Sequence, residues 1–273
     1  MFAWERLLEQ SHSCGHFVQL YQDERALGRN VGVFFWEGLR RGGSVLAITT
    51  PGHRKLFEQE LERLGANVAD LREGGRLLFL DAQSTLAEVT LNGQPEWARF
   101  EETIRAALRN FAPSTVAEDL RAYGEMVGIL WNARQYAAAV RLEQLWNKLL
   151  ESAHFSLYCA YAIDVFGNDF QAANLECVLR AHTHVMPGEI GGALEAALHR
   201  SMNEILGQHA DELRARTNGS RQPGWAIMPN AEWMILWLRE NLPAQADNIV
   251  RRARDYYKQL SGISPLRALA DTD

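Results

Sequence analysis

The most constraining feature of this chain is an alternation between short apolar runs and segments whose apolar residues recur at helical spacing, which continues to about residue 180. The continuous apolar run 44–49 (SVLAIT) predicts a strand buried on both faces. The segment 25–40 has apolar residues every three or four positions and is followed by Gly42 and Gly43, so it predicts a helix. Strands that alternate with helices form a mostly parallel sheet covered on both faces, which predicts an α/β fold.

The same reasoning places the other elements along the chain. We expect strands at 16–21, 44–49, 76–80, 116–123 and 156–161, and helices at 2–10, 25–40, 54–64, 97–110, 125–131, 136–151 and 170–182. The strand pattern ends at Pro187, and three helices are expected beyond it, at 189–216, 230–241 and 244–260, with a polar segment at 217–224. We therefore expect an α/β domain at 1–187 and a helical C-terminal extension at 188–273.

Composition narrows the classes of protein. The chain has 273 residues and a formal charge of −6, so it lacks the overall basic character of a nucleic-acid-binding protein. Its three cysteines are too few for a disulfide framework and fit a reducing compartment. The N-terminal sequence MFAWERLLEQ carries acidic residues, and no apolar run approaches the roughly 20 residues that span a bilayer. We expect a cytoplasmic protein that contacts neither nucleic acid nor membrane directly.

Several ordered motifs resemble one family. They are 16–21 (HFVQLY), 47–53 (AITTPGH), 120–131 (LRAYGEMVGILW), 139–147 (AVRLEQLWN) and 154–161 (HFSLYCAY). Together they resemble the MEDS family, the methanogen/methylotroph sensory domain also found in a dichloromethane-responsive regulator, over about residues 12–187. The resemblance implies a fold related to RecA and to the circadian-clock ATPase, and recognition of a small organic molecule. Family members often stand beside histidine-kinase or DNA-binding modules, but the extension is too short for a kinase core and shows no convincing helix-turn-helix.

The nucleotide-binding loop of RecA-type proteins has no counterpart here. A phosphate-binding loop needs G-x-x-x-x-G-K-[ST], so that backbone N–H groups and a lysine hold the phosphates. The corresponding segment 21–30 (YQDERALGRN) has one glycine, no lysine and two consecutive acids, Asp23 and Glu24, that would repel a triphosphate. We therefore predict a protein that is not an enzyme and uses no cofactor. The alternative is a degenerate nucleotide-binding ATPase or kinase-like enzyme.

Candidate ligand-binding residues follow from the sheet, because ligands of parallel sheets bind at the carboxyl ends of the strands. Glu125 follows Gly124 at a strand-to-helix junction, as a helix cap or a ligand contact. Glu143 and Asn147 lie four apart among apolar helix residues, as a buried polar network or as ligand contacts. The complete predicted ligand set is Tyr21, Thr50, His53, Asp81, Arg121, Glu125, Glu143, Trp146, Asn147 and Tyr161.

A metal site is a further alternative. His12, Cys14 and His16 are spaced by two, which places their side chains on one face of an extended segment, where they could hold Zn²⁺. Ordinary packing and polar roles explain the same residues, and we predict no metal. Cys159 lies in an apolar run and is expected to be an inert packing residue, and His182 is expected to cap carbonyls at a helix end.

The last two helices suggest how a signal leaves the molecule. Trp233 and Trp237 lie on one helix face, and the next helix carries Arg251, Arg252 and Arg254. Tryptophan and arginine are typical interface anchors. We expect a homodimer, or docking of a separate signalling protein such as a histidine kinase or transcription regulator. The predicted function is that of a sensory protein whose small-molecule ligand shifts these helices. A metal-dependent sensor remains an alternative.

Overall fold

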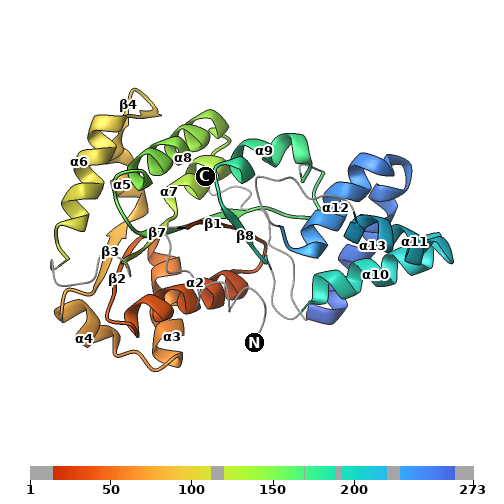
Figure 1. Cartoon of the computed structure of the whole chain (residues 1–273), viewed down its shortest axis with the longest axis horizontal. Coiled ribbons are helices and arrows are strands. Elements are labelled where there is room, and N and C mark those ends of the chain that lie inside the picture. Colours follow the sequence, from red (N-terminus) through yellow and green to blue (C-terminus); the bar gives the residue numbers. More distant parts are fainter. Residues whose placement is uncertain (1–14, 112–119, 169, 189–191, 220–227, 262–273) are drawn as a thin grey trace, which may run out of the picture.

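The protein is built around one parallel sheet. The computed structural model describes residues 15–111, 120–168, 170–188, 192–219 and 228–261 (Figure 1). Six strands pair in the order β3-β2-β6-β7-β1-β8, and every neighbouring pair is parallel. Their bounds are β1 His16–Tyr21, β2 Ser44–Thr49, β3 Leu77–Asp81, β6 Leu120–Gly124, β7 Ser156–Ala162 and β8 His184–Met186. The predicted α/β fold with a parallel sheet and helices on both faces is confirmed.

Helices cover the two faces of the sheet in separate groups (Figure 1). One face carries α2 Glu24–Leu39, α3 Pro51–Arg63 and α4 Val68–Glu73, and the other carries α5 Ala82–Val89, α6 Trp97–Leu108, α7 Met126–Asn132, α8 Tyr136–Leu150 and α9 Ala172–Arg180. Successive residues of β2 enter different apolar clusters, with Val45 and Ala47 in one and Leu46 and Ile48 in the other. This explains the continuous apolar run, because a strand with two covered faces has no position that favours a polar residue.

Four helices follow the sheet and lie beyond β8 (Figure 1). They are α10 Ala193–Leu206, α11 His209–Gly219, α12 Asn230–Asn241 and α13 Pro243–Ser261. Their buried apolar residues join the same cluster as the face covered by α5 to α9. A buried polar contact adds to this packing, since the carboxylate of Glu232 in α12 accepts a hydrogen bond of 3.0 Å from the backbone N–H of Gly188, just after β8.

The structure differs from the sequence-based expectations at a few elements. The helix predicted at 189–216 is two helices, because Gly207 takes φ 56° and ψ −127° between α10 and α11. The helices α4 and α5, the strand β8 and the small hairpin of β4 Thr90–Leu91 and β5 Gln94–Pro95 were not predicted. The helix predicted at 2–10 and most of the polar segment at 217–224 lie outside the described residues. Within the described ranges, no helix is both long and apolar enough to cross a membrane.

The strand order places a topological switch point between β2 and β6. The chain leaves β2 toward β3 on one side, while it leaves β6 toward β7 on the other. Such a reversal separates the connecting segments at the carboxyl ends of the two central strands, which is where open α/β sheets bind ligands. Thr49 and Thr50 at the end of β2 and Glu125 after β6 stand at this point.

Candidate functional site

A network centred on Glu125 joins the carboxyl ends of β2 and β6. Its Oε2 accepts hydrogen bonds of 2.8 Å from the Thr49 hydroxyl and 2.8 Å from the Thr50 backbone N–H. Its Oε1 accepts 3.0 Å from the Thr50 hydroxyl and 2.8 Å from Nδ1 of His53. We call these four residues the Glu125 network. Each carboxylate oxygen has two donors, so the network is satisfied by the chain itself.

The Glu125 network holds opposite charges. Burial disfavours ionisation of Glu125, but the hydrogen bond and charge of His53, with the donors of Thr50 and Thr49, hold its pKa below the ordinary value. Burial likewise disfavours the cationic form of His53, yet Glu125, with a smaller contribution from Glu24, raises its pKa. The pair is therefore an ionised carboxylate and a readily protonated imidazole, both nearly buried at the switch point of the sheet.

Two other predicted ligand residues lie next to this network. The ring of Tyr21 meets His53 edge-on, with centroids 6.0 Å apart, and burial together with Glu125 raises the pKa of its hydroxyl. Asp81 pairs with Thr49 in the sheet, but its side chain accepts a hydrogen bond of 2.8 Å from the backbone N–H of Ser84 and caps α5. Asp81 thus has a structural role that its position in the sequence did not reveal.

A second polar cluster lies inside the protein, between β1, β7 and α8. It consists of His16, Glu143, Cys159 and His182, all buried, whose potential metal-ligand atoms lie within 4.8 Å of one another. We call it the Glu143 cluster. Nε2 of His16 is 3.4 Å from both the Cys159 Sγ and a Glu143 oxygen. Nε2 of His182 is 3.4 Å from the other Glu143 oxygen.

Groups around the Glu143 cluster fix its side chains. The Tyr161 hydroxyl donates to Oε1 of Glu143 at 2.5 Å, and Asn147 Oδ1 lies 2.9 Å from Nδ1 of His16. Burial and the neighbouring His182 lower the pKa of His16 to about 3. Although burial opposes it, His182 and His16 hold the pKa of Glu143 at about 2. The structure thus brings together three predicted ligand residues, Glu143, Asn147 and Tyr161, with His16, which belongs to the trio considered as an alternative metal site.

A pocket of about 460 Å³ opens at the carboxyl end of β7. Its residues come from α7, the turn before α8, the end of β7 and α9, and we call it the β7 pocket. It is lined by Trp131, Arg134, Tyr136, Ala162, Ile163, Asp164, Gly167, Leu175 and Cys177. The rings of Trp131 and Tyr136 are 4.6 Å apart, and Trp131 also meets Tyr161 at 5.5 Å. Trp131 in the pocket lining therefore contacts Tyr161, which in turn contacts the Glu143 cluster.

The remaining predicted residues lie elsewhere. Arg121 stands at the amino end of β6, where it donates to the Phe34 carbonyl and packs over the Phe34 ring. Trp146 is fully buried, and its ring meets Phe100 at 4.9 Å. Trp233 and Trp237 are partly buried against the protein's own apolar core. His12 and Cys14 lie outside the described residues.

Sequence reasoning missed most of the β7 pocket and two members of the Glu143 cluster. Cys159 was assigned to packing because its neighbours in sequence are apolar. His182 was expected to cap a helix, and its Nδ1 does lie 2.7 Å from the Val178 carbonyl, as capping requires. Its other ring nitrogen faces Glu143, and no spacing rule connects residues so far apart in the chain. The unusual presence of Glu143 in an apolar helix face was the one available signal.

Comparison with known proteins identifies the family. The family described as the methanogen/methylotroph, DcmR sensory domain (MEDS) matches residues 15–183, well over half of the chain. This range contains the whole sheet except β8, together with the Glu125 network, the β7 pocket and the Glu143 cluster. No curated protein gives a significant match. The chain belongs to the MEDS family of sensory domains.

Proposed function

We propose that the protein is a non-catalytic regulator in which a small organic molecule binds in the β7 pocket and changes the position of α12 and α13. One observation carries this proposal. The segment 163–168 after β7 supplies residues to the pocket on one side and is held by side chains from α12 and α13 on the other. A molecule that moves this segment must also disturb its contacts with the C-terminal helices.

The pocket has the chemistry of a small-molecule site. Trp131 and Tyr136 present aromatic rings, and Ile163 and Leu175 add aliphatic surface. The charged groups of Arg134 and Asp164 provide polar anchors. Small-molecule sites are mostly apolar with a few polar groups that fix orientation. We therefore expect a ligand with an apolar body and one polar or charged group.

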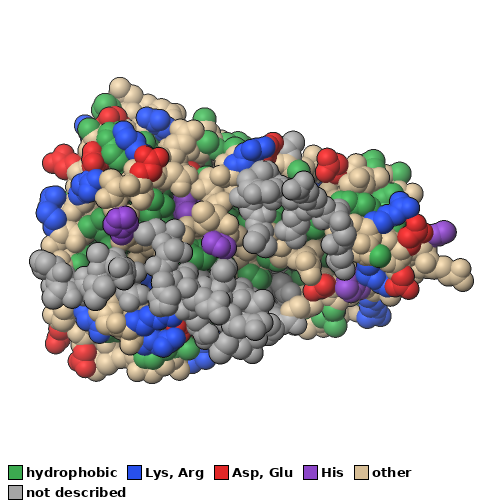
Figure 2. All heavy atoms as spheres, viewed as in Figure 1, with side chains coloured by type: hydrophobic (Ala, Val, Ile, Leu, Met, Phe, Trp, Pro, Cys, Tyr) green, Lys and Arg blue, Asp and Glu red, His purple; other side chains and the backbone are tan. Residues whose placement is uncertain are grey.

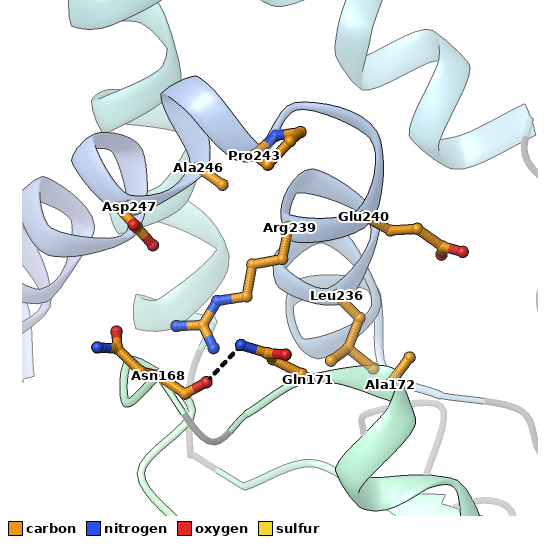
Figure 3. Close-up of a pocket in the computed structure, with 9 residues that line it drawn as sticks. All are labelled: Asn168, Gln171, Ala172, Leu236, Arg239, Glu240, Pro243, Ala246 and Asp247. Carbon is orange, nitrogen blue, oxygen red and sulfur yellow. Dashed lines mark hydrogen bonds between the residues drawn. The ribbon is translucent and has the colours of Figure 1, made fainter.

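The contacts on the other side of the segment come from two arginines. Arg239 of α12 donates to the carbonyls of Gly167, Phe170 and Phe166 at 2.6, 2.5 and 3.2 Å. Figure 3 shows its guanidinium reaching from α12 toward Asn168 and Gln171, across a pocket of about 500 Å³. Arg254 of α13 pairs with Asp164 at 2.5 Å. Since Asp164 also lines the β7 pocket, a ligand that engages its carboxylate competes with Arg254.

Output is proposed to pass through protein contacts of the extension, residues 188–273. A ligand shifts such an equilibrium only if it binds the two arrangements with unequal affinity. The partly exposed rings of Trp233 and Trp237 are the proposed contact for a second copy or for a separate histidine kinase or regulator. Figure 2 shows that described acidic and basic side chains are interspersed over the face in view, which does not favour direct nucleic-acid binding.

The alternative of a degenerate nucleotide-binding enzyme has less support. A phosphate would bind at the amino end of α2, where free backbone N–H groups attract anions. Here the carboxylate of Asp23 caps that end, by accepting 3.0 Å from the backbone N–H of Arg25, and Glu24 follows in the first turn. Both acids oppose the approach of a triphosphate.

The proposal is tested with three probe classes, namely short neutral alcohols, alkylammonium ions and short carboxylates. We expect one class to raise the thermal unfolding temperature of the full chain and to change hydrogen exchange in α12 and α13. Trp131→Ala should abolish the stabilisation, while Trp97→Ala, on α6 outside the pocket, should retain it. Arg254→Ala should keep binding but lose the exchange response in α13. If no class binds, or if Trp131→Ala binds unchanged, the proposal fails.

A further inference from the structure

The hydrogen bonds around the Glu143 cluster determine which ring nitrogens carry protons. Asn147 donates its Nδ2 to the Ala181 carbonyl at 3.0 Å, so its Oδ1 is the atom that faces Nδ1 of His16. Nδ1 of His182 faces the Val178 carbonyl at 2.7 Å. Both partners accept hydrogen bonds, so both Nδ1 atoms carry the proton. In the neutral rings, each Nε2 therefore directs a lone pair into the cluster.

The interior of the cluster has too many acceptors. When both rings are neutral, two imidazole lone pairs converge on the carboxylate of Glu143, to which the thiol of Cys159 donates at 3.7 Å. Nε2 of His182 is buried and has no hydrogen-bond partner within the part of the chain that the structure describes. Converging acceptors cost free energy in a buried site unless a donor or a cation lies between them.

The spacing of these atoms matches a tetrahedral metal site. Zinc–nitrogen and zinc–oxygen bonds of about 2.0–2.2 Å and a zinc–sulfur bond of about 2.3 Å place neighbouring ligands roughly 3.3–3.6 Å apart. The observed separations are 3.4 Å for His16 Nε2 to Cys159 Sγ, 3.4 and 3.7 Å for these two atoms to Glu143 Oε2, and 3.4 Å for His182 Nε2 to Glu143 Oε1. All the candidate ligand atoms lie within 4.8 Å of one another. To surround one ion, the wider of these separations must shorten and the Glu143 carboxylate must turn so that one oxygen faces the other three ligand atoms.

We propose that His16 Nε2, the Glu143 carboxylate, Cys159 Sγ and His182 Nε2 bind one divalent transition-metal ion, for which Zn²⁺ suits the mixed nitrogen, oxygen and sulfur donors. Asn147 and the Val178 carbonyl orient the two imidazoles through their Nδ1–H groups, which is the usual support of metal-bound histidine. With four protein ligands the site is closed, and the ion joins β1, α8, β7 and the turn between α9 and β8.

This site differs from the one suggested by local spacing. The trio His12, Cys14 and His16 shares only His16 with the proposed set. The three cysteines of the chain are Cys14, Cys159 and Cys177, so a Cys14→Ser/Cys177→Ser variant retains Cys159 alone. That variant tests the proposal without altering the cluster.

The experiment measures metal content and the spectrum of the cobalt-substituted protein. We expect the full chain, purified without chelators and supplied with zinc, to retain about one zinc ion per chain, as measured by elemental mass spectrometry. The Co²⁺ form should show intense tetrahedral d–d bands and a thiolate-to-cobalt charge-transfer band. Cys14→Ser/Cys177→Ser should keep the zinc and both spectral features. Cys159→Ser/His182→Gln should lose the zinc and the charge-transfer band.

His184→Gln is the matched control, since His184 lies two residues from His182 and stacks on Phe17 outside the cluster; it should bind zinc as the unaltered chain does. Three outcomes overturn the proposal. The first is a folded full chain that takes up no metal from zinc or cobalt solutions, as a plain His182–Glu143 ion pair would predict. The second is loss of the thiolate band in Cys14→Ser/Cys177→Ser. The third is retention of the zinc in Cys159→Ser/His182→Gln.

Discussion

Glu125 and Glu143 are two buried carboxylates that each face histidine, yet their surroundings are opposite. The four hydrogen bonds to Glu125 come from two hydroxyls, one backbone N–H and one imidazole N–H. Glu143 accepts from the Tyr161 hydroxyl and, at 3.7 Å, from the Cys159 thiol, while its two histidine neighbours direct their Nδ1 protons outward to Asn147 and Val178. Each oxygen of Glu125 therefore has two hydrogen-bond donors. Glu143 faces the Nε2 atoms of His16 and His182, which present lone pairs when the two rings are neutral.

The direction of the neighbouring histidine protons distinguishes the structural role of Glu125 from the proposed binding role of Glu143 more clearly than burial does. Both carboxylates have depressed pKa values, and both are held by histidine. The difference lies in the direction of each ring, which is fixed by what the other nitrogen contacts. At Glu125 the histidine supplies the missing donor, so the network holds β2 and β6 together. At Glu143 an additional cation completes the site.

The largest expected effect is that of Glu143→Ala. In the metal-bound protein this substitution removes the anionic partner of a buried cation and the acceptor of the Tyr161 hydroxyl, so we expect a loss of about 3–5 kcal/mol in the free energy of unfolding. Urea unfolding followed by circular dichroism measures this loss. Glu176→Ala is the control, because Glu176 pairs with Arg180 on the surface and should change stability by no more than about 0.5 kcal/mol. Equal effects of the two substitutions would contradict a binding role for Glu143 in the interior.

The second expected effect is a pH dependence of the Glu125 network. The raised pKa of His53 gives stability that is present below its ordinary value of 6.5 and is lost as the pH rises through the folded-state pKa. The lowered pKa of Glu125 gives stability that is present above 4.5 and is lost as the pH falls below it. His53→Gln should therefore lower the free energy of unfolding most between pH 4.5 and pH 6.5. The expected loss is about 1.5–3 kcal/mol, the contribution of a hydrogen bond between charged groups.

The measurement is a series of urea titrations of the unaltered chain and His53→Gln from acid to alkaline pH. The difference in stability should shrink as the pH rises well above 6.5, because His53 then becomes neutral in the folded protein. His199→Gln is the control, since His199 is partly exposed and its pKa is lowered by burial rather than raised. A difference that grows with pH would show that His53 is not a cation in this network.

The sequence predicted the regular elements well because their signals are local. Strands β1 and β2 and helix α12 have the predicted bounds, since apolar patterning and flanking glycine or proline residues define them. Helix α5 was missed because it is only eight residues long and begins directly after β3, and because its cap, Asp81, was assigned to ligand binding. Strand β8 has three residues and exists through pairing with β1, which no local pattern reveals.

Residues of the candidate site could be predicted only where the sequence of a single helix or strand contains an unusual residue. Glu143 and Asn147 stood out as polar residues among apolar neighbours, and both do lie in a buried polar cluster. Their partners His16, Cys159 and His182 come from two strands and a turn, so the sheet order had to be known first. The positions of Thr50, His53 and Glu125 followed from the rule for strand ends, which depends on topology alone.

The smallest expected effect is that of Thr50→Val, which removes one of the four donors to Glu125 and leaves the backbone N–H of the same residue in place. We expect a loss of about 1 kcal/mol, because three donors remain. The pKa of His53, measured by NMR, should stay above 6.5, since the carboxylate that raises it is unchanged. Thr85→Val is the control, because it removes a hydroxyl that donates to an uncharged acceptor, the Asp81 carbonyl. It should lower the free energy of unfolding by a similar amount. A much larger loss of stability in Thr50→Val, with a fall in the His53 pKa, would mean that Glu125 depends on every one of its donors. The Glu125 network would then be as sensitive to a single substitution as the Glu143 cluster is proposed to be.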